Sequence, residues 1–438
     1  MKLIKSLNKL GIELNEMQQA SYDAISKDDK DVVILSPTGS GKTLAYLLPL
    51  VELIDDNCDD IQAVVILPSR ELAIQSADVL SSLGSGIRTM ALYGGRAAMD
   101  EHRKMRDIKP HVVFATPGRL NDHLEKENIK ASTVSFLVID EFDKCLEMGF
   151  MEEMMQILEK LPAIKHRILL SATDSDVIPG FVSMHNTERI DYQAEEEQVP
   201  ERIHIYKVIC PTKDKLEPLG DLLRSFGSSS TIVFLNFRES VERTDEYLHT
   251  LGFVTSAYHG GLDQQQREDA LYKFMNGSAN VLVSTNLASR GLDIPDVENI
   301  IHYHLPETED DYIHRVGRTA RWEAQGRAFF LLGPNENIPE YVKETPASYE
   351  LPADLPKPAE PKNVTIYIGK GKKDKISKGD IVGVLCKKGG LKAMEIGRID
   401  VKERYSYVAI PRNKVNEVLC RVQGEKVKGV KTIFEEIR

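Results

Sequence analysis

Residues 32–43 read VVILSPTGSGKT, and this stretch decides the fold of the first part of the chain. The apolar residues Val32–Leu35 predict a buried strand, and the pattern from Leu44 onward predicts a helix. A glycine-containing loop, Ser36–Thr43, joins the two. A strand, a glycine loop and a helix N-terminus in this order form a phosphate-binding cradle in proteins. The stretch therefore predicts an α/β domain that binds a nucleotide.

The loop also predicts which residues contact the nucleotide. Gly39 and Gly41 let backbone N–H groups approach the phosphates, and Lys42 supplies charge to the β and γ phosphates. Thr43 offers a hydroxyl to Mg²⁺. Ser36 replaces the first glycine of the strict GxxxxGK[ST] pattern, so the assignment needs support from elsewhere in the chain. The predicted contacts in this loop are Ser36, Thr38, Gly39, Ser40, Gly41, Lys42 and Thr43.

Support comes from VIDEFD at residues 138–143, where two acids follow the apolar run Phe136–Ile139. In enzymes with this loop an Asp at the end of a neighbouring strand holds Mg²⁺, so Asp140 is predicted to bind the metal together with Thr43. Glu141 is placed to polarise the attacking water as a general base. The alternative is a solvated strand end without a chemical role, and the phosphate loop favours the catalytic interpretation.

Short apolar runs alternate with helix-length segments in the first three quarters of the chain. Fully apolar strands between helices indicate a parallel sheet covered on both faces. Two such series predict α/β domains at residues 1–194 and 203–343, joined by an acidic linker at 195–202. A proline-rich linker at 344–361 leads to residues 362–438, where the order β-α-β-β-α-β predicts a small α+β domain.

Composition narrows the class of protein. The 438 residues are 42% hydrophobic and 28% charged, as in soluble globular proteins. No apolar run approaches the roughly 18 residues of a membrane span, and the N-terminus lacks the apolar core of a secretory signal. Five cysteines without CxxC spacing argue against a zinc site or disulfide framework and predict a cytoplasmic protein.

The net charge of −11 hides an asymmetry along the chain. Residues 362–438 hold 19 Lys and Arg against 9 Asp and Glu, whereas the remainder holds 37 against 58. A basic module on an acidic body is typical of a nucleic-acid-binding tail, although a solvated surface without a ligand has the same composition.

Nine sequence elements together resemble the DEAD-box RNA helicases. Besides the phosphate loop and DEFD at 140–143, they are PSRELA at 68–73, GG at 94–95, TPGR at 116–119, SAT at 171–173, Gln264 with Arg267, Thr285 followed by SRGLD at 289–293, and HRVGRTAR at 314–321. The resemblance covers roughly residues 10–339. It implies two RecA-like parallel-sheet domains with ATP and Mg²⁺ as cofactors, and an RNA-stimulated ATPase that unwinds or remodels short RNA duplexes.

The resemblance also implies roles for individual residues. Catalysis is implied for Lys42, Asp140, Glu141 and the arginine fingers Arg318 and Arg321. Nucleotide contacts extend to both fingers and to Gln18, Gly291 and Asp293. Residues that couple ATP to domain closure are Asp143, Ser171, Thr173, His314 and Arg315. Residues that contact RNA are Pro68, Arg70, Gly94, Gly95, Thr116, Arg119, Gln264, Arg267 and Thr285.

Three positions depart from the family pattern. Ser69 stands where Thr is usual, which preserves a hydroxyl. Gln18 matches the adenine-reading glutamine, but the usual Pro-Thr before it and an upstream aromatic are missing, which puts strict adenine specificity in doubt. Phe142 stands where the family's name has Ala. Because Phe142 lies between residues that face the nucleotide, we expect its side chain to point away, into neighbouring packing.

Residues 362–438 resemble the RNA-binding domain of the DbpA subfamily, which has an RRM-like fold. The likeness includes IYIG at 366–369, GKKDKI at 371–376 and YSYVAI at 405–410. It implies binding to large-subunit ribosomal RNA and a role on pre-ribosomal particles. The alternative for the two tyrosines among the RNA contacts is a place in the core. The predicted contacts are Tyr367, Lys372, Lys373, Arg404 and Tyr407.

We expect a monomer with RNA as its partner and no membrane contact. Two other functions stay open: an ATP-gated RNA clamp or scaffold with little unwinding, and a DNA-directed translocase of the wider superfamily. A short-duplex unwinding assay with and without ATP separates the clamp from the helicase. Comparing ATPase stimulation by RNA and by DNA separates the translocase.

Overall fold

The computed structural model describes residues 13–27, 30–36, 40–95, 98–172, 180–193, 203–289, 294, 297–319 and 325–437. The chain divides near residue 198 into two compact units. None of the described helices has both the length and the apolar composition that a bilayer crossing requires.

The first unit contains a seven-stranded parallel sheet with strand order β3-β4-β2-β5-β6-β1-β7. Its strands are β1 (Val32–Leu35), β2 (Ala63–Ile66), β3 (Thr89–Leu92), β4 (Val112–Ala115), β5 (Phe136–Ile139), β6 (His166–Ser171) and β7 (Glu188–Asp191). Its helices are α2 (Glu16–Ile25), α3 (Lys42–Leu53), α4 (Arg70–Ser82), α5 (Ala98–Ile108), α6 (Pro117–Glu125), α7 (Phe142–Glu147) and α8 (Met151–Lys160).

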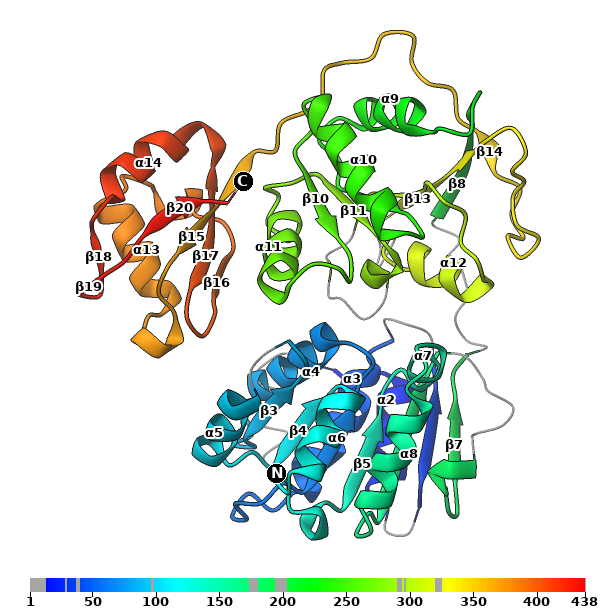
Figure 1. Ribbon diagram of the computed structural model, residues 1–438, viewed down its shortest axis with the longest axis vertical. Coiled ribbons are helices and arrows are strands. Elements are labelled where there is room, and N and C mark those ends of the chain that lie inside the picture. The colour runs from blue at the N-terminus through cyan, green and yellow to red at the C-terminus, as the bar shows by residue number, and fades with distance from the viewer. Residues whose placement is uncertain are drawn as a thin grey trace. The chain divides into compact units, whose positions relative to one another are not determined.

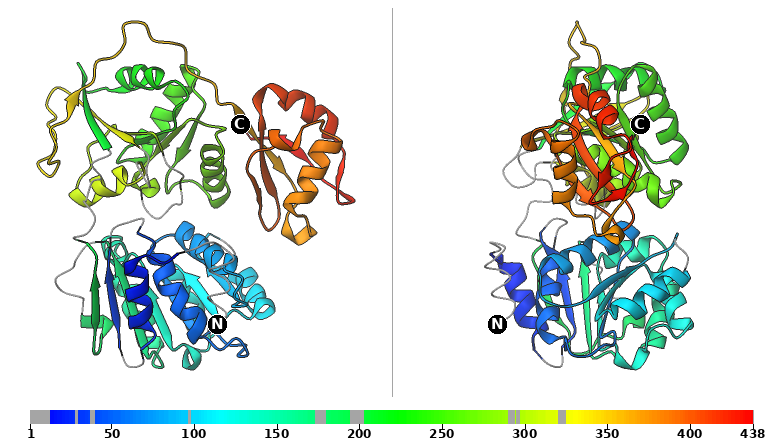
Figure 2. Two further views of the ribbon diagram at one scale, coloured as in Figure 1. Left: turned by 180° about the vertical axis from the view of Figure 1, so that it is seen from behind. Right: turned by 90° about the vertical axis from the view of Figure 1, so that its left-hand side faces the viewer.

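Both faces of this sheet are buried. Successive side chains of a strand point to opposite faces, so Val32 and Ile34 of β1 belong to one hydrophobic core and Val33 and Leu35 to the other. Helices lie over each face, as the two viewing directions of Figures 1 and 2 show. This arrangement explains why the strands read as continuous apolar runs.

The second unit begins with another seven-stranded parallel sheet, of order β10-β11-β9-β12-β13-β8-β14. Its strands are β8 (Ile203–Ile209), β9 (Thr231–Phe234), β10 (Thr255–Tyr258), β11 (Val281–Ser284), β12 (Asn299–His302), β13 (Gly326–Leu332) and β14 (Ala347–Ser348). Its helices are α9 (Leu216–Phe226), α10 (Arg238–Thr250), α11 (Gln264–Met275) and α12 (Glu309–Val316).

The edge strand β14 comes from the segment predicted as a proline-rich linker. Ala347 and Ser348 pair with β8, and Tyr349 N–H donates to Lys207 O at 2.9 Å. The Tyr349 ring packs edge-on against Phe329, with centroids 5.2 Å apart. An aromatic side chain that adds to the core therefore extends the second sheet beyond the boundary expected at residue 343.

The C-terminal part of the second unit is a four-stranded antiparallel sheet of order β16-β17-β15-β20. Its elements are β15 (Asn363–Ile368), α13 (Lys378–Lys387), β16 (Ile399–Val401), β17 (Ser406–Pro411), α14 (Val415–Val422) and β20 (Phe434–Glu436). A short hairpin of β18 (Lys426–Val427) and β19 (Val430–Lys431) precedes β20. The predicted order β-α-β-β-α-β and the predicted fold class, two parallel-sheet domains followed by a small α+β domain, are confirmed.

Candidate functional site

The predicted phosphate loop lies between the end of β1 and the start of α3. Gly41 is the N-cap of α3 and has a left-handed backbone conformation, with φ 88°. The positive φ favours glycine, and a Cβ there would lie 2.3 Å from Gln18 Nε2, so a larger residue would displace the Gln18 side chain. Lys42 is buried and its Nζ donates a hydrogen bond to Ser36 O. Thr43 follows in the first turn of the helix, where N–H groups and the helix dipole favour an anion.

The N-terminus of α2 holds the same loop. Asn15 Nδ2 donates to Ser40 O at 2.9 Å, and Gln18 Nε2 donates to Gly41 O at 3.2 Å. Gln18 Oε1 accepts from Asn15 N at 3.1 Å, so both ends of the amide are bonded. The predicted adenine-reading residue is therefore tied directly to the predicted phosphate loop.

Asp140 lies at the same edge of the first sheet as the loop. Only β6 separates β5 from β1, and Ser36 N–H donates to Ser171 O, at the end of β6, at 3.1 Å. Burial raises the pKa of the Asp140 carboxyl to about 6, and the positive charge of Lys42 opposes this shift. The predicted residues Lys42, Asp140 and Ser171 thus lie together.

Glu141 is the N-cap of α7 and has a backbone conformation that is uncommon outside glycine, with φ 50° and ψ 52°. Its N–H donates to Asp140 Oδ1 at 2.9 Å. The next residues start the helix, where Phe142 belongs to the hydrophobic core that contains Ile139, and Asp143 is buried. The negative charge of Asp143 contributes to the raised pKa of Asp140. The expectation that Phe142 points into packing is confirmed.

The residues at this edge fit a magnesium ion. Among the described residues, no three His, Cys, Asp or Glu side chains cluster as a protein-only metal site. Mg²⁺ keeps several waters in proteins and needs one or two carboxylates together with substrate phosphates. Asp140 is 4% exposed, and a cation would compensate the burial of its charge. Asp140 with the Thr43 hydroxyl is therefore a suitable set of protein oxygens for Mg²⁺.

The first group of predicted RNA contacts lies beyond β2 and β3. Pro68 is buried after β2, and Arg70 begins α4. The Arg70 guanidinium lies against Gly94 and Gly95, because a Cβ on Gly95 would meet Arg70 Nη1 at 2.6 Å. Gly95 has φ 90°, a backbone conformation that favours glycine, and a Cβ there would displace the Arg70 side chain.

The second group centres on α6. Thr116 is its N-cap, and Arg119 Nε donates to Tyr93 O at 3.3 Å. Glu101, 4% exposed, lies 3.3 Å from Arg119 Nε and 3.1 Å from His123 Nε2. Glu101 and His123 therefore hold Arg119 in place, and sequence reasoning missed both. Nothing in the local pattern marks them, since they lie on different helices and meet only in the fold.

The predicted RNA contacts of the second unit lie on α11 and after β11. Gln264 and Arg267 occupy the first turn of α11, where Arg267 Nη2 donates to Gln264 Oε1 at 3.2 Å. Asp263 caps this helix by accepting from Gln266 N at 2.8 Å. Thr285 follows β11, and its side chain accepts from Leu287 N at 3.5 Å.

Arg315 joins three strand ends of the second sheet. It donates from Nη2 to Asn236 Oδ1, from Nε to Asn286 Oδ1 and from Nη1 to His304 O, each at 2.8 Å. Its guanidinium also lies 5.3 Å from the centroid of the Phe234 ring. A planar guanidinium reaches three separated acceptors from three different nitrogens in a fixed plane, whereas a lysine donates from a single nitrogen. Sequence reasoning missed Asn236 and Asn286, although each closely follows a buried strand.

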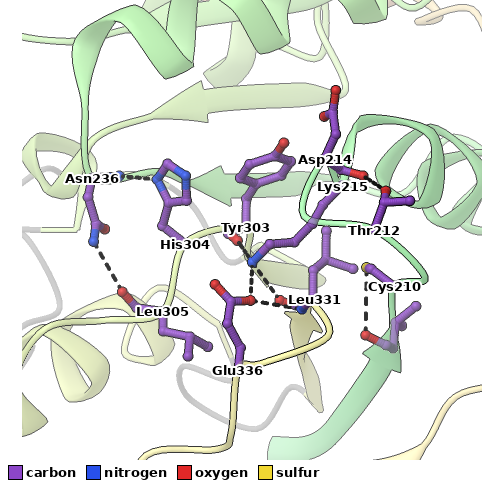
Figure 3. A network of polar contacts seen from close by, with 12 residues as sticks. Cys210, Thr212, Asp214, Lys215, Asn236, Tyr303, His304, Leu305, Leu331 and Glu336 are labelled. Carbon is purple, nitrogen blue, oxygen red and sulfur yellow. Dashed lines mark hydrogen bonds and ion pairs between the residues drawn. The ribbon is translucent and has the colours of Figure 1, made fainter.

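A buried lysine supports one of these strand ends, as Figure 3 shows. Lys215 Nζ donates to Tyr303 O at 2.7 Å, to Leu331 O at 2.9 Å and to Glu336 Oε2 at 2.5 Å. The adjacent His304 accepts from Asn236 N at 3.1 Å through Nδ1. Lys215 therefore fixes the segment that offers its carbonyl oxygen to Arg315.

Two further predicted residues are buried around the end of α12. His314 is 4% exposed, and Arg318 is 1% exposed with its Nε donating to Ser289 O at 2.9 Å. The remaining predicted site residues lie outside the described residues; they are Thr38, Gly39, Thr173, Gly291, Asp293 and Arg321.

The predicted RNA contacts of the C-terminal domain occupy two different surfaces. Lys372, Lys373 and Arg404 are exposed. Lys372 N donates to Lys402 O at 2.8 Å, which brings the first turn after β15 beside the loop between β16 and β17. Tyr407, in contrast, is completely buried, and Tyr367 is half-buried beside it.

Comparisons with known proteins agree with this arrangement. Residues 15–178 match the DEAD/DEAH box helicase family, and residues 214–323 match the helicase conserved C-terminal domain. Residues 365–436 match the DbpA RNA binding domain. These three matches follow the first sheet, the second sheet and the antiparallel sheet in order.

Curated relatives and solved structures extend the likeness. The ATP-dependent RNA helicase DbpA of Bacillus subtilis is 32% identical, over 98% of this chain and 95% of its own length. That of Escherichia coli is 33% identical, over 97% and 95%. Saccharomyces cerevisiae Dbp5 bound to RNA and ADP BeF3 is 25% identical over 76% of this chain and 88% of its own, with a TM-score of 0.69. The chain belongs to the DEAD-box family and is an ATP-hydrolysing RNA helicase with a DbpA RNA-binding domain.

Proposed function

We propose that this helicase unwinds or remodels short RNA duplexes during assembly of the large ribosomal subunit, as a cytoplasmic monomer that binds ribosomal RNA on pre-ribosomal particles. The proposal is supported mainly by the C-terminal domain. Residues 365–436 match the DbpA RNA binding domain, and residues 362–438 hold 19 basic against 9 acidic residues. Such a surface attracts RNA phosphates through long-range electrostatics.

The proposed hydrolytic site uses residues gathered at the edge of the first sheet. Lys42 binds the β and γ phosphates, and Asp140 with Thr43 would hold Mg²⁺. When bound, Mg²⁺ neutralises charge on the phosphates. Glu141 accepts a proton from the attacking water, and its fixed left-handed backbone orients the side chain. Gln18 contacts the adenine edge. Because Gln18 is also hydrogen-bonded to Gly41 O, adenine binding would affect the position of the phosphate loop.

Residues of the second unit complete the proposed mechanism. Arg318 and Arg321 stabilise negative charge on the transferring phosphoryl group. The proposed RNA contacts bind phosphates and 2′-hydroxyls, which makes the core tolerant of sequence. The C-terminal domain then supplies the preference for ribosomal RNA. The proposed coupling residues are Asp143, Ser171, Thr173, His314 and Arg315.

The test is ATPase rate against ribosomal RNA, arbitrary RNA of equal length and DNA. We expect stimulation by RNA alone, with half-saturation at the lowest concentration for ribosomal RNA. Equal stimulation by DNA would favour a translocase. A short-duplex unwinding assay with and without ATP runs in parallel, and binding without strand separation would favour a clamp.

The source of the preference is tested in the full-length chain. We expect Lys372→Glu, Lys373→Glu and Arg404→Glu together to abolish the preference for ribosomal RNA while stimulation by arbitrary RNA remains. Glu395, Glu417 and Glu425 lie on the same domain, and changing them to Lys is a control that adds charge elsewhere. If the preference survives the triple charge reversal, these residues are not the determinant.

A further inference from the structure

The open face of the C-terminal sheet carries three tyrosines. Tyr367 lies on β15, Tyr407 pairs with it on β17, and Tyr405 precedes that strand. The Tyr405 ring centroid is 5.5 Å from that of Tyr367 and 5.1 Å from that of Tyr407. Exposed aromatic rings on a sheet of this kind are a common platform for stacking RNA bases.

This face is covered by α11 of the second parallel-sheet domain, which Figure 1 shows beside β15 and β17. Tyr407 Oη donates to Asp269 Oδ1 and accepts from Gln265 Nε2 at 2.5 Å. Tyr405 Oη donates to Glu268 Oε2 at 2.5 Å. Tyr407 is 0% exposed, so a base cannot stack on its ring while α11 is in place.

The contact continues along the rest of the helix. The Tyr272 ring packs on Tyr407, with centroids 4.7 Å apart, and Tyr272 Oη donates to Arg398 O at 2.6 Å. Asn276 Nδ2 donates to Thr365 Oγ1 at 2.7 Å. Thr365 Oγ1 in turn donates to Ser278 Oγ at 3.0 Å. Polar groups from both domains therefore satisfy one another inside the contact, as in a specific, fixed interface.

The two faces of α11 have different partners. Gln265, Asp269, Tyr272 and Asn276 recur three or four residues apart, so they form one stripe, and this stripe meets the C-terminal sheet. The proposed RNA contacts Gln264 and Arg267 lie outside that stripe, in the first turn of the same helix. One rigid helix thus joins the C-terminal domain to an RNA-contacting position of the helicase core.

We infer that the tyrosine face is a docking surface for α11 of the same chain, and that it stays docked while RNA is bound. RNA then binds the C-terminal domain elsewhere, and α11 holds that domain at a fixed position relative to Gln264 and Arg267. This last step rests on the proposed RNA contacts. The proline-rich connection before residue 362 consequently does not let the domain swing freely during RNA binding.

A reversible disulfide across the contact tests the inference in the full-length protein. Ser278→Cys with Thr365→Cys replaces two hydroxyls whose oxygens are 3.0 Å apart, and the longer C–S bonds can bring the two sulfurs to the roughly 2 Å of an S–S bond. Cys58, Cys386 and Cys420 are changed to Ser so that only this pair can react, whereas Cys145 and Cys210 are buried. Each single-cysteine variant is the control for effects of substitution alone.

We expect the disulfide to form, and the oxidised and reduced proteins to bind a ribosomal RNA fragment within about twofold of each other. Loss of RNA affinity on oxidation that reduction restores would overturn the inference, because the sheet would then be the RNA platform. Failure of the pair to oxidise would overturn it as well, since the domains would not be docked. Lack of any RNA stimulation in the reduced protein would instead contradict the proposed function.

A second variant separates docking from RNA affinity. Asp269→Arg removes the acceptor of the Tyr407 hydroxyl and places a longer, cationic side chain in the contact, so the disulfide should form at least about tenfold more slowly. We expect the preference of the ATPase for ribosomal RNA to fall with it. Glu217→Arg on the exposed side of α9 makes the same charge change outside the contact and should alter neither. An unchanged disulfide rate and an unchanged preference in Asp269→Arg would contradict the inference.

Discussion

Glu141 combines backbone strain with a proposed catalytic role, and two substitutions separate them. Its φ of 50° and ψ of 52° are left-handed, which costs a residue with a Cβ on the order of 1–2 kcal/mol. Glu141→Gly removes this strain, but glycine makes the unfolded chain more flexible by about 0.5–1 kcal/mol. We therefore expect the free energy of unfolding to rise by up to about 1.5 kcal/mol. Glu141→Gln keeps the Cβ and the strain, so its stability should stay within about 0.5 kcal/mol.

Both substitutions remove the carboxylate that would accept the proton of the attacking water. General base catalysis contributes about 10²–10⁴ in rate, so kcat for ATP hydrolysis at saturating RNA should fall by that factor in both variants. Nucleotide affinity should change little, because in the proposed site the loop and Lys42 hold the phosphates.

The assays are steady-state ATPase rates, equilibrium nucleotide binding and denaturant unfolding of the three proteins. The Gln and Gly variants should have the same low kcat but different stabilities. If Glu141 had only a structural role, kcat would instead follow stability. Near-normal turnover of Glu141→Gln would refute the general-base assignment. A Gly variant that is less stable than the Gln variant would refute the argument from strain.

Three further predictions follow from buried side chains. Lys42→Ala should weaken ATP binding measured by equilibrium titration, and unchanged affinity would contradict the phosphate-loop assignment. Phe142→Ala should lower the free energy of unfolding by about 3–5 kcal/mol, because Phe142 is 3% exposed in the core, while ATPase activity per folded molecule changes much less. Burial lowers the pKa of His302 well below its usual value, so the unfolded chain binds the extra proton. Stability should fall by up to about 1.4 kcal/mol per pH unit as pH drops below roughly 6.5, and His302→Phe should remove that part of the slope in denaturant unfolding between pH 7.5 and 5.5.

The sequence predicted those features that depend on neighbours along the chain. Val32–Leu35 and Phe136–Ile139 read as buried strands because both faces of a parallel sheet exclude water, and the loop before Lys42 follows from local backbone needs. Glu101 beside Arg119 and Lys215 beside Glu336 could not be predicted, because each pair meets only after distant elements pack. The residue type alone does not show whether a charged side chain is buried or exposed.

The tyrosines of the C-terminal domain illustrate the same limit at the level of domains. Period-two alternation places Tyr405 and Tyr407 on one face of a sheet, but it does not say what lies opposite that face. The opposing stripe on α11 includes two polar residues, Asp269 and Asn276, that would be expected on a solvated helix. In this protein they are the hydrogen-bond partners of buried hydroxyls. A polar helix face and an aromatic sheet face are each typical of a surface that contacts water or RNA. Here the two faces contact each other. Docking within one chain therefore has to be considered before an aromatic sheet face is assigned to RNA.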